Sequence, residues 1–240
     1  MTTENFILPD WPAPATIKAY TSLKESGIGA DDYKNSTRLN ELLALPNEPY
    51  WLKQIHGADV IPATTRPRTG HPEADASYTD QPNTVCVVRT ADCLPVFITN
   101  RQGTQIAAIH AGWRGLAADI LPITLQKMGI TPADALVWLG PGISGERFEV
   151  RKDVYDIFTG KNAANKTAFN KISDEQWLLD LYAVARMQLQ KQGVTQIFGG
   201  EYCTYSDPER FFSYRRDGKL TGRIISLIWI ADSTNKKNHV

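Results

Sequence analysis

The chain has 240 residues, 42% of them apolar, which is enough to bury the core of one large domain. Its 26 basic residues balance its 26 acidic residues, so no overall field would recruit nucleic acid or an acidic membrane, and anion binding must come from local arginines. Three cysteines without a CxxC pair indicate a reduced compartment, and the sequence shows neither a cleavable leader nor a run of about twenty apolar residues, so we expect a cytoplasmic protein.

The N-terminal part of the sequence predicts short elements separated by turns. Residues 1–20 contain three prolines, which indicates an extended lead-in. A short helix should begin at Asn35 or Ser36, because either residue can cap its N-terminus, and it should end before Pro46.

The next segment alternates in the way of a half-buried strand over residues 50–55, which would place His56 at a strand end. Residues 59–63 are the expected hairpin partner of this strand. Residues 64–83 are rich in proline and turn formers and predict a surface loop, from which Asp75 could point inward.

Two apolar runs within residues 84–115 each break off at a reactive side chain. These side chains are Cys93 and His110. The pattern predicts three short strands with a polar group at each join. Because α/β proteins commonly place their chemistry where a strand meets the next element, we expect the functional site here.

The rest of the chain alternates irregularly between helical and strand patterns. Residues 113–128 predict a helix whose first half is irregular or kinked because of Pro122. Further helices are expected over 151–160 and 175–192, strands over 135–139, 194–198 and 223–230, and a disordered tail over 232–240. These elements predict a single α/β domain over residues 1–240, with mixed β-sheets flanked by helices.

One cysteine and two of the four histidines form a good zinc set, namely His56, Cys93 and His110. Three protein ligands leave a fourth position for water or substrate, which is typical of a catalytic site. Their spacing matches no zinc finger or ribbon. The pattern alone therefore leaves open that Cys93 is a small core residue and that His110 is a satisfied core histidine.

Arginines near these residues offer an anion site. Exposed amides near Gly115, at an expected helix start, could hold phosphate together with Arg114. Aromatic residues directly before Arg215 and Arg216 favour a folded groove there, although a solvated surface position is an alternative for these arginines. Asp92 is a candidate proton donor.

Long motifs are spread over residues 49–230. They are QIHG at 54–57, ADASY at 74–78, TADCLPV at 90–96, AAIHAGWRG at 107–115, WLGPGI at 138–143 and FGGEYCTYSDPERFFSYRRDGKLTGR at 198–223. Together they strongly resemble the multicopper polyphenol oxidase, or laccase-domain, family, whose members are also described as purine nucleoside phosphorylases.

The resemblance implies that His56, Cys93 and His110 bind zinc, with copper possible at the same ligands, in a fold similar to that of certain Cys-His putative cysteine hydrolases. It implies phosphorolysis of adenosine, inosine, guanosine and methylthioadenosine to base and sugar 1-phosphate, with adenosine deamination as a side activity. We expect a monomer whose partners are small-molecule purine nucleosides and phosphate.

Two other activities are alternatives. In the first, Cys93 is a thiolate nucleophile activated by His110, which would give an amide hydrolase of the kind linked in some members to editing of cell-wall precursors. In the second, a single copper supports laccase-like oxidation of polyphenols. Four histidines are too few for the copper clusters of a true multicopper oxidase.

The sequence departs from the family pattern before residue 49. The family has a longer, histidine-bearing loop there and an arginine where this chain has Ser36. We expect this shortening to weaken anion binding, and Ser36→Arg to restore it if the helix packs beside the cleft.

Overall fold

The computed structural model describes residues 3–29, 36–65 and 70–232. The helices are α1 (Ser36–Leu43), α2 (Trp113–Ala117), α3 (Ile120–Met128), α4 (Lys152–Lys161), α5 (Leu181–Lys191) and α6 (Tyr214–Asp217). The strands are β1 (Phe6–Ile7), β2 (Ile17–Ser22), β3 (Val60–Pro62), β4 (Ala76–Thr79), β5 (Cys86–Thr90), β6 (Leu94–Asn100), β7 (Ile106–Ala111), β8 (Ala135–Leu139), β9 (Glu149–Arg151), β10 (Phe169–Lys171), β11 (Gln176–Leu179), β12 (Gln196–Gly199) and β13 (Ile224–Ile230). The possible cap Asn35 and the tail beyond Asp232 lie outside the described residues.

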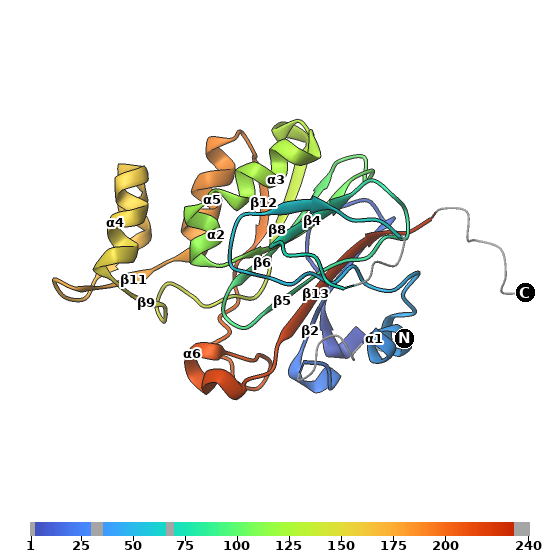
Figure 1. Ribbon diagram of the computed structural model, residues 1–240, viewed down its shortest axis with the longest axis horizontal. Helices are drawn as coiled ribbons and strands as arrows, with labels where there is room; N and C mark the ends of the chain where they lie inside the picture. Colours follow the sequence, from blue (N-terminus) through green and yellow to red (C-terminus); the bar gives the residue numbers. More distant parts are fainter. Residues whose placement is uncertain (1–2, 30–35, 66–69, 233–240) are drawn as a thin grey trace, which may run out of the picture.

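Two sheets stack face to face at the centre of the molecule (Figure 1). One has six strands in the order β12-β8-β6-β7-β4-β3, and the other has four in the order β1-β2-β13-β5. The core between them includes Val88 from β5, Phe97 from β6 and Trp138 from β8, with the last two rings stacked. Burial of such large side chains is the main stabilising contribution of this interface.

Helices cover the outer faces of both sheets. The outer face of the six-stranded sheet packs against α2, α3 and α5, and α1 packs through Leu39 and Leu43 on the outer face of the four-stranded sheet. A third sheet, β10-β11-β9, forms a lobe with α4 beside these layers (Figure 1).

The strand pairings confirm the predicted α/β class with mixed sheets. In the six-stranded sheet β6, β7 and β8 are antiparallel to their neighbours within this group, whereas β12 runs parallel to β8 and β3 parallel to β4. No helix in the described ranges is long and apolar enough to cross a membrane.

The helix predicted over residues 113–128 is interrupted, as Pro122 suggested, but the break lies earlier. The chain leaves the helical conformation at Asp119, whose φ is 61°, between α2 and α3. Pro122 then falls in the first turn of α3, where its missing N–H removes no helical hydrogen bond.

Three predictions about local structure are wrong. Residues 50–55 form isolated bridges and no hairpin, and β3 pairs instead with β4 in parallel. Residues 176–179 form strand β11, and α5 begins only after Asp180, whose carboxylate accepts a 3.0 Å hydrogen bond from the Ala183 amide. Residues 76–79 of the predicted surface loop form strand β4 inside the six-stranded sheet.

A glycine at the end of β12 offers a test of this packing. Gly199 has φ of 71°, and a Cβ there would lie 2.3 Å from the Leu139 carbonyl oxygen. Gly129 has φ of 66° with open space around it. We expect Gly129→Ala to cost about 1–2 kcal/mol from the left-handed conformation alone, and Gly199→Ala to cost at least about 1 kcal/mol more because the backbone must shift. Urea unfolding of both variants measures the difference, and equal losses would contradict the close contact.

Candidate metal centre and substrate cavity

Neighbouring antiparallel strands bring Cys93 and His110 together. The thiol directly precedes β6, and the imidazole belongs to the end of β7, where the register pairs Pro95 with His110. The turn before β6 requires the left-handed conformation at Asp92, whose φ is 89°. Cys93 and His110 thus meet at one end of the β6-β7 pair.

His56 reaches the same point from a loop held by Asp75. The carboxylate of Asp75 accepts hydrogen bonds from the amides of Ile55 (3.3 Å), His56 (2.9 Å) and Gly57 (2.6 Å). These contacts fix a backbone in which His56 has φ of 60°, a conformation that is uncommon for residues other than glycine. The loop therefore owes its shape to a residue about twenty positions further along the chain.

The same carboxylate orients His110. Its Oδ1 lies 2.7 Å from His110 Nδ1, and the His110 amide donates to the Asp75 carbonyl at 2.7 Å. Both side chains are buried. Because Nδ1 is taken by Asp75, Nε2 is the nitrogen left to face the other two groups of the cluster.

The donor atoms of His56, Cys93 and His110 all lie within 4.8 Å of one another, and the two imidazole rings cross at 83°. The backbone leaves room for them at Gly112, where a Cβ would lie 3.0 Å from Cys93 Sγ. Two imidazoles and one thiolate with a carboxylate behind one imidazole are a donor set that fits a transition metal such as zinc or copper. The cluster can therefore bind a metal ion, as the sequence predicted.

Charge interactions between Cys93, His110 and Asp75 favour the ionised form of each group in the metal-free cluster. Burial would raise the pKa of Cys93, but the charges and hydrogen bonds of His110 and His56 outweigh burial and lower this pKa to about 6. Burial would likewise lower the pKa of His110, but Cys93 and Asp75 raise it. The pKa of Asp75 is lowered because its hydrogen bonds, above all the one from His110, outweigh its burial. A thiolate is the form in which cysteine binds a metal or attacks a substrate.

A cavity of about 460 Å³ opens beside the cluster. His56 is exposed toward solvent and lines this cavity together with Cys93 and His110, so the open side of the cluster faces it. The remaining lining residues are Arg89, Thr90, Ala91, Asp92, Trp113, Arg114, Ile143, Phe148, Leu181, Tyr214, Arg215 and Arg223. A hollow of this size is ordinary for a small-molecule site.

Two of the predicted arginines line the cavity. Arg114 lies with its guanidinium 4.3 Å from the centre of the Trp113 ring. Arg215 lies over Phe148 and donates from both terminal nitrogens to the Glu149 carbonyl at 3.1 and 3.0 Å. Each guanidinium is held against an aromatic face, which leaves positive charge at the cavity wall.

Asp92 lines the cavity as well, but its two carboxylate oxygens are already bonded. One accepts from the Thr204 hydroxyl at 2.6 Å and the other from the Arg215 amide at 2.6 Å. Both carboxylate oxygens thus act as acceptors, and the second one anchors the start of α6. They disfavour the predicted role of Asp92 as a proton donor.

The structure corrects three other site predictions. Arg216 points away from the cavity, because its guanidinium donates to the carbonyls of Thr204, Tyr205 and Phe211. Gly115 is a packing position in α2, where a Cβ would lie 2.9 Å from the Gly57 carbonyl oxygen. Ser36 bonds to Glu48 and accepts from the Trp51 indole at 3.1 Å, and it does not line the cavity. The expected gain from Ser36→Arg therefore has no structural basis in the described residues.

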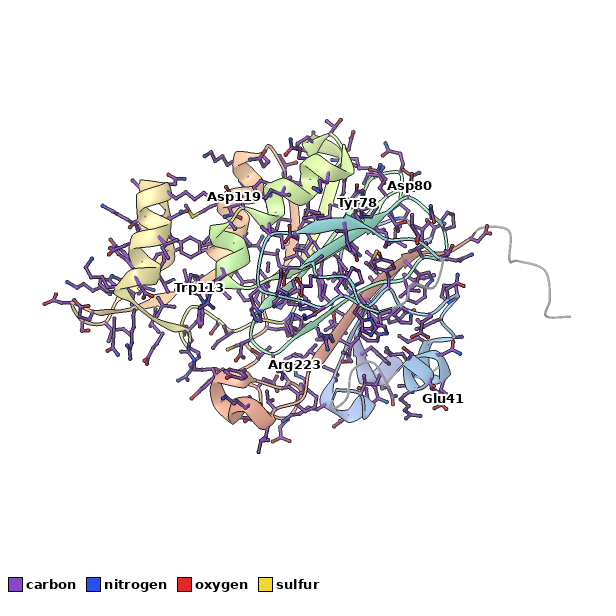
Figure 2. All side chains as sticks on the ribbon, viewed as in Figure 1. Glu41, Tyr78, Asp80, Trp113, Asp119 and Arg223 are labelled. Carbon is purple, nitrogen blue, oxygen red and sulfur yellow. The ribbon has the colours of Figure 1, made fainter. Side chains whose placement is uncertain are left out.

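Sequence reasoning missed Asp75 as the organiser of the cluster and Arg223 as a cavity residue. The small residues around Asp75 signalled that it could point inward, and this is confirmed. Arg223 directly precedes β13 and lines the cavity, and Figure 2 labels it near the start of that strand. Its position just before an apolar strand is the one signal that could have identified it.

Comparisons with known proteins found similar sequences over most of this chain. The sequence model of a family described as multi-copper polyphenol oxidoreductase laccase matches residues 29–231. Purine nucleoside phosphorylase YfiH of Escherichia coli (strain K12) is 43% identical over 241 residues, which cover 93% of this chain and 98% of that protein. Purine nucleoside phosphorylase PA4543 of Pseudomonas aeruginosa is 38% identical over 245 residues, covering 95% and 99%.

Solved structures show the same fold. The Neisseria meningitidis protein NMB0706 matches with a TM-score of 0.88 and 40% identity, covering 95% of this chain and all of that chain (100%). YlmD from Geobacillus stearothermophilus matches with a TM-score of 0.81 and 26% identity, covering 95% and 99%.

Proposed function

Because the chain belongs to the multi-copper polyphenol oxidoreductase laccase family, several of whose members are named purine nucleoside phosphorylases, we propose that it is a zinc-dependent purine nucleoside phosphorylase. Its substrates would be adenosine, inosine, guanosine and methylthioadenosine, with deamination of adenosine as a side activity. The observation that supports this proposal most is the His56-Cys93-His110 cluster opening into a cavity lined by arginines. We place the enzyme in the cytoplasm as a monomer, where Cys93 stays reduced.

The three cluster residues would hold zinc, which would supply Lewis acidity on the cavity side of the cluster for phosphorolysis or deamination. Asp75 keeps the His110 ring in one orientation and tautomer through the 2.7 Å contact to Nδ1. Arg114 and Arg215 would hold the phosphate dianion near the sugar, and their aromatic supports limit the entropy lost on binding. The chain thus supplies an anion site and a metal site on the walls of one cavity.

The family name multicopper oxidase does not match the donor groups of this chain. A multicopper oxidase needs a histidine-rich cluster beside a separate copper, whereas the whole chain has four histidines. Within the described residues, the His56-Cys93-His110 group is the one set of three donors close enough to hold an ion. A single copper could occupy these ligands, and polyphenol oxidation would then be incidental.

A nucleoside panel tests the proposed activity. The purified protein, analysed for metal, is incubated with each of the four nucleosides, with and without phosphate. We expect the free base and the sugar 1-phosphate to form only in the presence of phosphate. Free ribose in place of the 1-phosphate, or equal rates without phosphate, would exclude phosphorolysis.

One observation favours a second candidate function. Asp75, His110 and Cys93 form a carboxylate-imidazole-thiol series, and the pKa of Cys93 is lowered to about 6, as a thiolate nucleophile would require. An amide hydrolase would carry its acyl group on this thiol during turnover.

A trapping experiment separates the two functions of Cys93. If the thiolate is a metal ligand, no substrate adduct should form on it with any of the nucleosides, because the metal occupies its lone pair. Mass spectrometry of protein quenched during turnover measures this. A mass increase located at Cys93, and absent from Cys203 in the same sample, would instead support the hydrolase.

A further inference from the structure

A second hollow adjoins the metal-side cavity. It has a volume of about 410 Å³ and shares three lining residues with that cavity, namely Trp113, Phe148 and Arg215. Its other walls come from the lobe formed by α4, β9 and β11 (Figure 1). Figure 2 labels Trp113 at the boundary between this lobe and α2. The two hollows are therefore neighbouring compartments of one cleft, separated by a sill made of these three residues.

The three residues of the sill can contact an elongated molecule that extends through both compartments. Trp113 and Phe148 are both partly exposed, and Arg215 is fixed over Phe148 by its two bonds to the Glu149 carbonyl. Two aromatic faces offer contact to an apolar chain at small entropic cost, because each ring has only two rotatable bonds. A neutral thioether or alkyl linker fits such a place better than a charged one.

The second compartment carries charges of both signs. Glu149 and Arg151 are two residues apart on β9, so their side chains leave the same face of the strand about 6.6 Å apart along it. Asp153 follows at the start of α4 and also lines the compartment. Within the described part of the chain, none of these three side chains forms an ion pair. Val154 adds an apolar contact to the wall, whereas the Val150 side chain leaves the opposite, buried face of β9.

This pairing of charges matches a zwitterion. An amino acid group has a carboxylate and an ammonium on one carbon, so Arg151 can bind the first while Glu149 or Asp153 binds the second. Inorganic phosphate would meet the carboxylates of Glu149 and Asp153 here as well as Arg151 and Arg215, so the compartment offers a dianion no net positive charge. The compartment thus fits the end of a substrate and not the phosphate that attacks it.

We propose that the second compartment binds the amino acid end of a purine nucleoside that carries a 5′-thioether chain, such as S-adenosylhomocysteine. The purine and ribose lie beside the metal cluster, the thioether crosses the sill, and the amino acid group reaches β9. This inference rests on the proposed phosphorylase activity. An oxygen of monohydrogen phosphate bonds to the anomeric carbon, the bond from that carbon to adenine N9 breaks, and N9 receives the proton that phosphate brought. The products are adenine and S-ribosylhomocysteine 1-phosphate.

The test compares S-adenosylhomocysteine with methylthioadenosine, which has the same thioether but no amino acid group. Calorimetric Kd and kcat/KM are measured for both in the wild-type protein and in Arg151→Gln and Glu149→Gln. Lys152→Gln is the matched control, because Lys152 lies next to Arg151 but pairs with Asp156 at 2.6 Å and does not line the compartment.

We expect the wild-type protein to bind S-adenosylhomocysteine more tightly than methylthioadenosine by about tenfold or more, the range for one hydrogen bond to a charged group. Arg151→Gln and Glu149→Gln should each remove most of this difference and leave methylthioadenosine and the control unchanged. Equal binding of the two ligands, or equal effects of the variants on both, would overturn the inference. Tight binding of S-adenosylhomocysteine without its cleavage, by a protein that does cleave methylthioadenosine, would also overturn it. Failure to cleave methylthioadenosine and adenosine would count against the phosphorylase activity, and Kd would still test the compartment separately.

Discussion

The His110→Ala variant is expected to lose its bound metal and its phosphorolytic activity together. His110 supplies one of three donor groups, and a site with two remaining donors binds zinc weakly. Losing an outer partner of a ligand typically lowers metal affinity about 10–100-fold, so the loss of the ligand itself should exceed this. Elemental analysis after gel filtration, followed by an inosine cleavage assay, measures both quantities.

His71→Ala is the control for this variant. His71 is exposed and lies outside both the metal-binding cluster and the cavity. It should retain metal and activity at the wild-type level. A His110→Ala protein that keeps a full complement of metal would show that the three donors do not form the site.

The Asp75→Asn variant is expected to lower metal affinity about 10–100-fold without removing any ligand. Asp75 accepts from three loop amides and from His110 Nδ1, and the amide nitrogen of asparagine cannot accept any of these bonds. At least one buried donor then loses its partner, which should cost about 1–3 kcal/mol of folding stability. Competition with a zinc chelator measures the affinity, and urea unfolding measures the stability.

Asp59→Asn serves as the matched change, since Asp59 is exposed and contributes its backbone carbonyl, not its carboxylate, to the neighbouring strand. Unchanged zinc affinity in Asp75→Asn would mean that the loop of His56 holds its shape by other means. A loss of stability without a loss of zinc affinity would limit Asp75 to a structural role.

The sequence predicted the centre of the site well because its signals there are local. The apolar runs before and after Cys93 are strands β5 and β6, and the run that ends at His110 is β7. The antiparallel pairing of β6 with β7 then places Cys93 beside His110. The family resemblance is also confirmed by the matches over most of the chain. Periodicity and short motifs carry this kind of information.

The segment before His56 was predicted wrongly because side chains replace its strand pairing. The Gln54 side chain accepts from the Arg89 amide and donates to the Arg89 carbonyl, both at 2.8 Å, in the way that a neighbouring peptide group would. Asp75 then takes the amides that follow. An alternating pattern cannot distinguish a strand bonded through its backbone from a segment held by distant side chains.

The predictions for Arg216 and for the start of α5 were wrong for the same physical reason. The guanidinium of Arg216 is bound by carbonyls from residues 204–211, and no charge pattern shows where these carbonyls lie. At α5, Leu178 fits the helical spacing of Leu181, Tyr182 and Ala185 by chance while it pairs in β11, so only the cap formed by Asp180 marks the true boundary.

Zinc titration of metal-free protein tests the central claim most directly. The rate of ribose 1-phosphate formation from inosine is followed at saturating phosphate as zinc is added to protein stripped by a chelator. We predict almost no activity without zinc and a linear rise that ends at about one zinc per chain, the stoichiometry of a single three-ligand site. Full activity in the metal-free protein, or a rise that continues well beyond one zinc per chain, would contradict a catalytic metal at His56, Cys93 and His110.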